Sequence, residues 1–208
     1  MCAGKSIRYP KPYPKVLEPI LNEPNYKRTI RLLNENGIDD VIITVSDEDS
    51  HYFDYQNKII GLNEREIDRF RNVKDSINNE TLILYGDVIY HEDDIKTILN
   101  NLNDEIKFFG RFMNNMNLNY ILFGEIFGIY IANKNKFFNA VDITATKFEK
   151  KLIEREIGLD VFKELQLKIT DLITLSEYTD DFDIIEKYNL MKDIYENKLN
   201  INDKNKYK

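Results

Sequence analysis

The sequence predicts a single α/β domain with a mostly parallel central sheet flanked by helices. Short runs of β-branched and aliphatic residues, which are typical of buried parallel strands, alternate with segments whose apolar residues recur at helical spacing. Strands and helices that alternate in this way form α/β units. The length of 208 residues and the 42% hydrophobic content suit one folded domain of ordinary size. We assign residues 1–200 to this domain and residues 201–208 to a polar C-terminal tail.

The expected elements follow one another along the chain. Helices are predicted where apolar residues recur at helical spacing, over residues 26–36, 65–77, 91–103, most of 137–165 and 184–199. Strands are predicted over the apolar runs at residues 41–45, 58–60, 81–85, 106–112, 125–132 and 172–175. Gly37 is expected to end the first helix, because glycine is frequent just beyond a helix C-terminus. Residues 179–183 are expected to form a loop before the last helix.

The composition excludes several classes of protein. The chain carries 29 Lys and Arg against 36 Asp and Glu, a net charge of −7, so its surface on average repels nucleic acid. Cys2 is the only cysteine, which excludes an intramolecular disulfide and a zinc site built from cysteines. No apolar run is long enough for a membrane span, and the N-terminus lacks the apolar core of a signal peptide. We therefore expect a cytoplasmic protein.

The first twenty residues combine small residues with cations. Residues 3–6 read Ala-Gly-Lys-Ser, and Arg8, Lys11 and Lys15 are interleaved with three prolines. The backbone N–H groups of such a loop can surround an anion, and fixed cations beside it favour polyphosphate. A P-loop also ends in Gly-Lys-Ser, but it must lead into a helix, which the prolines prevent. The alternative without a ligand is a proline-rich surface arm with solvated charges.

Carboxylates follow a predicted strand and precede the last predicted helix. Gly86 and Asp87 come directly after residues 81–85, at the sheet edge where open α/β folds bind ligands. Gly86 allows a ligand to approach the backbone, and Asp87 offers the oxygen ligand that Mg2+ prefers. Asp181 and Asp183 stand just before the last helix. Without a ligand, Gly86 and Asp87 would form an ordinary turn, and the later acids would cap a helix.

Two stretches resemble the loop of the sugar-phosphate and phosphocholine-type nucleotidyltransferases, roughly A-A-G-x-G-x-R followed by P-K-x-L-x-P-I. Residues 2–8 (Cys-Ala-Gly-Lys-Ser-Ile-Arg) and 14–20 (Pro-Lys-Val-Leu-Glu-Pro-Ile) match that loop in order. The acids after the strand and before the last helix also stand in the family's order. Ser6 replaces the family's second glycine, and Ile184 replaces the threonine usual after the second acidic pair. The resemblance spans about residues 2–195 and implies a Rossmann-like nucleotidyltransferase fold, with the short chain closest in kind to the small cytidylyltransferases.

The resemblance implies an enzyme that transfers a nucleoside monophosphate from a nucleoside triphosphate to a small phosphorylated metabolite and releases pyrophosphate. Mg2+ would be its cofactor. The short chain favours CTP as the donor, and hence transfer of CMP, for the decoration of a surface glycan or lipid. The base, the acceptor and the oligomeric state stay open. The alternative is a catalytically inactive relative that binds a nucleotide and acts as a regulatory or interaction module.

The resemblance also implies roles for individual residues near the nucleotide. Arg8 would hold the departing β- and γ-phosphates, and Lys15 would neutralise the α-phosphate as charge builds there. The residues that would bind the base and phosphates through their backbone are Ala3, Gly4, Ser6 and Gly86.

The implied metal ligands are Asp87 and Asp183, with Asp181 and then Asp142 as alternatives to Asp183. Glu125, at the start of a predicted strand, would contact the acceptor. In the resembled family a central strand precedes the first loop, whereas only Met1 and Cys2 precede that loop here. Since unpaired buried backbone groups cost about 1–3 kcal/mol each, we expect a short β-branched stretch upstream of Met1.

Overall fold

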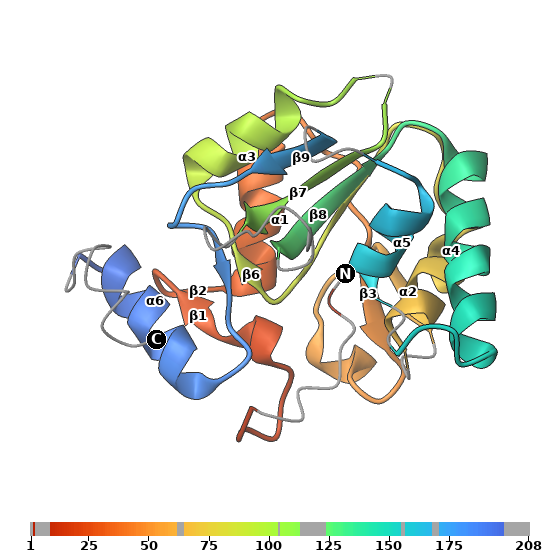
Figure 1. Cartoon of the computed structure of the whole chain (residues 1–208). Coiled ribbons are helices and arrows are strands. Elements are labelled where there is room, and N and C mark those ends of the chain that lie inside the picture. The colour runs from red at the N-terminus through yellow and green to blue at the C-terminus, as the bar shows by residue number, and fades with distance from the viewer. Residues whose placement is uncertain are drawn as a thin grey trace.

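The computed structural model describes residues 2, 9–61, 65–103, 105–112, 124–154, 157–167 and 171–197 and has an α/β architecture (Figure 1). Its largest sheet has four strands in the order β5 (Thr81–Leu84), β8 (Gly124–Ile131), β7 (Lys107–Phe112) and β9 (Leu172–Thr174). β8 is antiparallel to both β5 and β7, and β9 is parallel to β7. All strands of this sheet except β8 therefore run in one direction, which confirms the predicted mostly parallel sheet with β8 as the exception.

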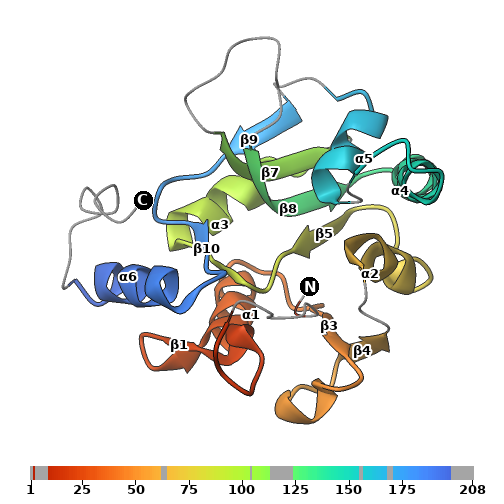
Figure 2. The ribbon, with the colours of Figure 1, turned by 60° about the horizontal axis from the view of Figure 1, so that its bottom comes forward.

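Helices cover both faces of this sheet (Figure 2). One face packs against α2 (Glu66–Val73), α4 (Lys134–Glu149) and α5 (Gly158–Glu164), and the other against α1 (Asn25–Glu35) and α3 (Glu92–Leu99). Successive strand residues alternate between the two faces, as the pleat requires. Ile83, Phe108 and Ile129 contribute to the first core, and Leu84, Phe109 and Tyr130 to the second. This two-faced burial explains why apolar residues stand next to one another along the strands rather than only at alternate positions.

Three further strand pairs lie outside the four-stranded sheet. β3 (Ile43–Ser46) pairs with β4 (Lys58–Gly61) in parallel, and β1 (Pro19–Ile20) forms a short hairpin with β2 (Glu23–Pro24). β6 (Val88–Ile89) pairs with β10 (Asp180–Asp181) in the antiparallel sense. A third apolar cluster joins the N-terminal segment, β6, Phe182 just after β10, and α6 (Ile185–Tyr195). Residues from both ends of the chain therefore meet beside the turn that follows β5.

Two predicted segments differ from the structure in detail. The helical stretch at residues 137–165 is interrupted between α4 and α5, where Lys151 adopts a positive φ of 56° that a helix cannot continue through. The predicted loop at residues 179–183 contains β10, whose two acidic residues carry no apolar pattern that would mark a strand. Within the part of the chain that the structure describes, every helix is too short or too polar to cross a bilayer.

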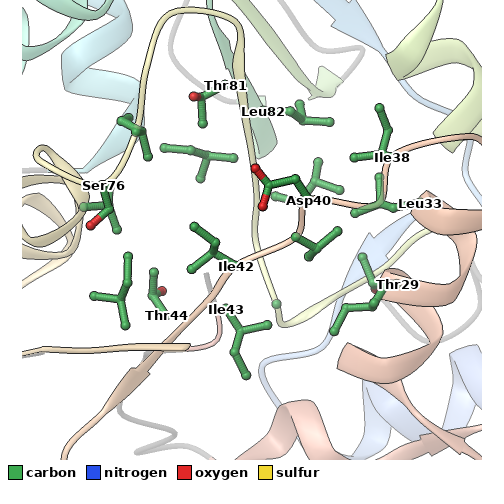
Figure 3. A pocket seen from close by; sticks show the side chains of 18 of the residues that line it. Thr29, Leu33, Ile38, Asp40, Ile42, Ile43, Thr44, Ser76, Thr81 and Leu82 are labelled. Atoms are coloured by element: carbon green, nitrogen blue, oxygen red, sulfur yellow. The ribbon is translucent and has the colours of Figure 1, made fainter. Parts of the chain in front are cut away.

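A cavity of about 440 Å3 separates β3 from β5 (Figure 3). Its walls are mostly aliphatic and come from α1, residues 38–44 and residues 76–86. Cys2 also lines it, and the backbone N–H of Cys2 donates to the carbonyl of Thr44 on β3 (3.0 Å). The β3–β4 pair and the four-stranded sheet are thus distinct sheets, with this apolar space between their nearest strands.

Candidate active site

The turn after β5 brings two distant acids together. Tyr85, Gly86 and Asp87 connect β5 to β6, and β10 then pairs with β6. The backbone N–H of Phe182 extends this pairing by donating to the carbonyl of Asp87 (3.1 Å). Asp183, the next residue, is thereby placed beside Asp87 at the C-terminal end of β5. This is the sheet edge at which α/β folds bind their ligands.

Lys15 lies between these two acids. It begins the short 3-10 helix η1 (Lys15–Leu17), and its Nζ is 2.8 Å from Oδ2 of Asp87 and 2.6 Å from Oδ1 of Asp183. Only 10% of the Lys15 side chain is exposed, whereas each carboxylate is 34% exposed. Three of the residues that the sequence singled out therefore meet at one point. We call Asp87 and Asp183 the acid pair, and Lys15 is its lysine. Their roles in binding and catalysis stay predictions.

The electrostatic environment keeps Lys15 charged. Burial disfavours the ammonium, but attraction and hydrogen bonding from Asp87 and Asp183 outweigh it, so the pKa of Lys15 is raised above its ordinary value. The ring of Phe182 lies 5.9 Å from Nζ and adds a further favourable contact. Lys15 is therefore protonated at neutral pH while it lies between the two carboxylates.

The acid pair suits a divalent cation. Each acid directs one carboxylate oxygen at the same cationic nitrogen, so both oxygens converge on one position. Carboxylate oxygens are the ligands that Mg2+ prefers, and a site of this kind uses one or two of them together with phosphate oxygens. Asp87 and Asp183 could therefore hold such an ion together, and their role as metal ligands stays a prediction.

Asn25 secures the turn that carries Asp87, and the sequence analysis did not identify it. The side chain is fully buried at the start of α1, and its Nδ2 donates to the carbonyls of Gly86 (3.0 Å) and Val88 (2.9 Å). These two carbonyls flank Asp87, so Asn25 fixes the backbone on both sides of it. The only local signal was an asparagine before a helix, which is usually read as a cap or turn residue.

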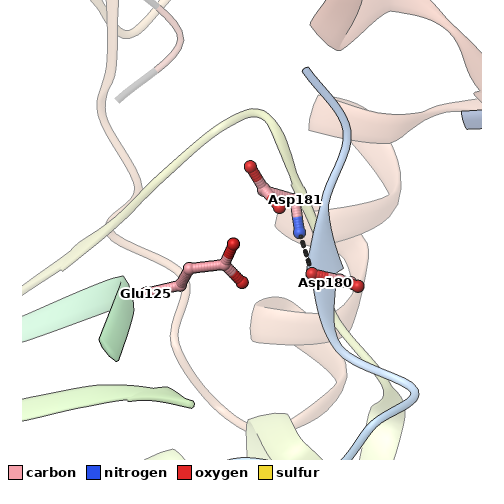
Figure 4. A group of neighbouring side chains, drawn as sticks. All are labelled: Glu125, Asp180 and Asp181. Carbon is pink, nitrogen blue, oxygen red and sulfur yellow. Dashed lines mark hydrogen bonds between the residues drawn. The ribbon is translucent and has the colours of Figure 1, made fainter. Parts of the chain in front are cut away.

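A second group of carboxylates lies close to the first. Glu125 on β8 and Asp180 and Asp181 on β10 have ligand atoms within 4.8 Å of one another (Figure 4). We call these three residues the acidic cluster. The guanidinium of Arg111 contacts Glu125 and Asp180, each at 2.7 Å, and Lys187 of α6 contacts Asp180 (3.1 Å) and Asp181. The spacing alone would suit a metal ion, but two cations already lie among these acids.

A β-bulge positions Arg111, one of the two cations that contact the acidic cluster. The register between β7 and β8 shifts at Phe109 and Gly110, after which Arg111 stands opposite Glu125. A Cβ on Gly110 would come within 2.0 Å of the carbonyl oxygen of Glu125, so only glycine allows this close approach. The bulge therefore directs Arg111 toward β10 at the end of the sheet.

The pKa values in the acidic cluster reflect its burial. Burial raises the pKa of Asp181 to about 6, with Lys187 opposing this rise and Glu125 and Asp180 adding to it. Burial tends to lower the pKa of Arg111, but Asp180 and Glu125 outweigh that effect and raise it. Asp181 is engaged with Lys187, as Asp183 is with Lys15, and which of the two would be the second metal ligand stays a prediction.

The remaining predicted site residues fall into three groups. Asp142, the third alternative for the metal, lies on α4 and pairs with Arg71 (3.1 Å) and Lys74 (3.5 Å) near α2. Glu125 lies in the acidic cluster, at the same end of the sheet as Asp180, and its contact with an acceptor stays a prediction. The predicted nucleotide-binding residues Ala3, Gly4 and Ser6 and the predicted catalytic residue Arg8 lie outside the described part of the chain.

Comparisons with known proteins support one fold. No protein-family model matches the chain, and no curated protein matches it. Among solved structures, it is similar to a CTP:phosphocholine cytidylyltransferase from Streptococcus pneumoniae (TM-score 0.59, 14% identity, covering 93% of this chain and 96% of the other). It is also similar to a putative glucose-1-phosphate thymidylyltransferase from Bacillus anthracis (TM-score 0.59, 15% identity, covering 93% and 92%).

A third similar structure is the 2-C-methyl-D-erythritol 4-phosphate cytidylyltransferase from Francisella tularensis (TM-score 0.55, 12% identity, covering 91% of this chain and 96% of the other). All three likenesses extend over nearly the whole of both chains at low identity, so they establish the arrangement of the elements rather than the chemistry. The chain has the Rossmann-like fold of the nucleotidyltransferases.

Proposed function

We propose that this protein is an Mg2+-dependent nucleotidyltransferase that transfers a nucleoside monophosphate to a small phosphorylated metabolite and releases pyrophosphate. The observation that carries this proposal is the convergence of Lys15, Asp87 and Asp183 at the C-terminal end of β5. A fixed cation beside two partly exposed carboxylates suits the handling of a polyphosphate and its metal. The three proteins of the same fold compared above are named for a nucleotide and a phosphorylated metabolite as substrates. This supports the same class of substrates here.

The proposed reaction is an in-line displacement at phosphorus. An oxygen of the acceptor's phosphate attacks the α-phosphorus of the triphosphate and forms a new P–O bond. The bond from the α-phosphorus to the bridging oxygen breaks, and pyrophosphate leaves with that oxygen. Such a reaction needs positioning and charge neutralisation more than a covalent intermediate. Lys15 would bind the α-phosphate, where charge increases toward the transition state.

The other predicted residues complete the proposed site. Asp87 and Asp183 would hold Mg2+, which when bound neutralises phosphate oxygens and orients them. Asn25 would keep Asp87 in place through the carbonyls on either side of it. Arg8 would hold the β- and γ-phosphates, and Glu125 would contact the acceptor. The proposed contacts to the rest of the nucleotide come from Ala3, Gly4, Ser6 and Gly86.

CTP is the donor that we favour. Two of the similar structures are cytidylyltransferases, and a further one is a CMP-sugar-acid synthetase with bound CTP (TM-score 0.50, 12% identity). The thymidylyltransferase among the similar structures is the counterexample. The product would then be a CMP-activated metabolite, suited to the decoration of a surface glycan or lipid.

Pyrophosphate release tests the proposal. The protein is incubated with Mg2+, each of CTP, UTP, ATP, GTP and dTTP, and a panel of phosphorylated amino alcohols, polyols and sugars. We expect release with one donor and one acceptor class, and its loss in Lys15→Ala. Lys107→Ala is the matched control, because the Lys107 side chain is also 10% exposed and also lies near two carboxylates, Glu105 (2.7 Å) and Asp171 (3.8 Å). Nucleotide binding without release for any acceptor would instead favour the inactive, regulatory alternative.

A further inference from the structure

Lys15 holds the position where the two predicted metal ligands converge. Its Nζ lies 2.8 Å and 2.6 Å from one oxygen of Asp87 and one of Asp183. These are the distances of charge-assisted hydrogen bonds. A divalent cation shared by the same two oxygens would lie next to this ammonium, and like charges at such separations repel strongly when they are shielded from water.

The ammonium is held there by the fold. The neighbouring residue Val16 is buried, and the backbone N–H of Glu18 donates to the carbonyl of Lys15 (3.0 Å), which closes η1. Prolines stand on both sides of this helix at Pro14 and Pro19, where their rings limit backbone motion. The root of the side chain is therefore fixed, while its four-carbon stem keeps the rotatable bonds that allow Nζ to move.

We propose that Lys15 is an internal counter-ion that blocks the metal site until a polyphosphate binds, a role that rests on the proposed function. Without nucleotide, the ammonium neutralises Asp87 and Asp183 and the free protein binds divalent cations weakly. A triphosphate brings oxygens that bind both the ammonium and the ion. Lys15 then moves from the carboxylates to the phosphates, and the acids become available. Metal and nucleotide thus bind cooperatively, and each raises the affinity for the other by the same factor.

A counter-ion and a merely structural ion pair lead to different metal binding in the absence of nucleotide. If Lys15 only stabilised the fold, its removal would lower stability without creating a metal site. If it is a counter-ion, removing its charge leaves two converging carboxylates that attract a cation. The informative variants are Lys15→Met and Lys15→Gln, which are neutral and of similar length, and Lys15→Arg, which keeps the charge.

The first measurement is Mn2+ binding without nucleotide, followed by electron paramagnetic resonance of the free ion. We expect Lys15→Met and Lys15→Gln to bind one Mn2+ about tenfold or more tightly than the wild type, since one local charge is removed from the site. Lys15→Arg and the matched Lys107→Met should resemble the wild type. Adding Asp87→Asn to Lys15→Met should abolish the increase in Mn2+ affinity. Equal Mn2+ affinity in the wild type and both neutral variants would overturn the inference.

Thermal unfolding with Mn2+ alone supplies a second readout that needs no activity. Lys15→Met and Lys15→Gln should melt below the wild type, and Mn2+ should raise their Tm while leaving those of the wild type and Lys107→Met nearly unchanged. A Tm that Mn2+ does not move in either neutral variant would contradict the counter-ion role.

Mn2+ titration of the wild type in the presence of CTP separates this inference from the proposed function. Tight Mn2+ binding with and without CTP would refute the counter-ion role alone. No Mn2+ binding in any variant, even with each nucleoside triphosphate present, would refute the metal site and the proposed function together.

Discussion

The acid pair and the acidic cluster each take acids from the segment at residues 180–183, which contains β10, yet they are built differently. Asp180 of the acidic cluster is only 1% exposed and contacts two cations that come from β7 and α6. Asp87 and Asp183 are each 34% exposed and share the ammonium of Lys15. A nearly fully buried acid that joins three elements stabilises the fold, whereas partly exposed acids around one lysine can exchange that cation for a ligand.

Removing the buried acid should have the largest effect on stability. Asp180→Ala leaves Arg111 and Lys187 without the carboxylate they share, and breaking a buried ion pair on one side costs about 3–5 kcal/mol. Urea unfolding at neutral pH measures this loss. Asp183→Ala, three positions along, should cost clearly less because its carboxylate is partly hydrated. Equal losses for the two variants would remove the distinction between the two groups of acids.

Removing the lysine of the acid pair should affect catalysis more than stability. Lys15→Ala should lower kcat about 100- to 1000-fold and nucleotide affinity far less, because charge on the α-phosphate grows toward the transition state. Steady-state kinetics of pyrophosphate release give both parameters. A variant with a raised KM and an unchanged kcat would mean that Lys15 contributes only ground-state binding.

The sequence placed Lys15, Asp87 and Asp183 in one site, whereas it singled out Glu125 and Asp181 separately and did not indicate that they group with Asp180 and Arg111, for a physical reason. Asp87, Asp183 and Lys15 each stand at a place that local pattern can identify, after a strand, before a helix and within a proline-flanked loop. Arg111 lies inside an apolar strand and finds Asp180 69 residues away. Its role depends on the bulge at Gly110 and on the pairing of β6 with β10, neither of which has a signal in local periodicity.

For the fold, the sequence likewise predicted the positions of most elements but not every relation between them. The helices at α1, α2, α3 and α6 and most strands lie where apolar spacing placed them, because burial on two faces of a sheet leaves a strong pattern. Strand direction was less accessible. β8 is antiparallel to β7, and its sequence is as apolar as that of a parallel neighbour. Asn25 was missed for the same reason as Arg111, since its partners Gly86 and Val88 lie 61 and 63 residues away.

The next largest effect is expected in the acidic cluster, where Asp181 should make the free energy of unfolding depend on pH. The pKa of Asp181 is raised from 3.8 to about 6, so the folded protein keeps this proton in a pH range where the unfolded chain has lost it. Asp181 therefore lowers the free energy of unfolding as pH rises from about 4 to about 6, by at most about 3 kcal/mol. The difference in free energy of unfolding between the wild type and Asp181→Asn should fall across this range. A difference that is flat with pH would contradict the raised pKa.

The smallest expected effect comes from Asn25, and it tests how the acid pair is positioned. Asn25→Ala removes two buried hydrogen bonds to the carbonyls of Gly86 and Val88, which should cost about 1–3 kcal/mol of stability. Because those carbonyls flank Asp87, the variant should also weaken Mn2+ binding in the presence of nucleotide. Asn101→Ala is the control, since its Nδ2 donates only to the carbonyl of Thr97 within the same helical region and should change neither quantity appreciably. If Asn25→Ala loses stability but binds Mn2+ like the wild type, Asp87 is held by its pairing with Phe182 and Lys15 alone, and the turn needs no support from α1.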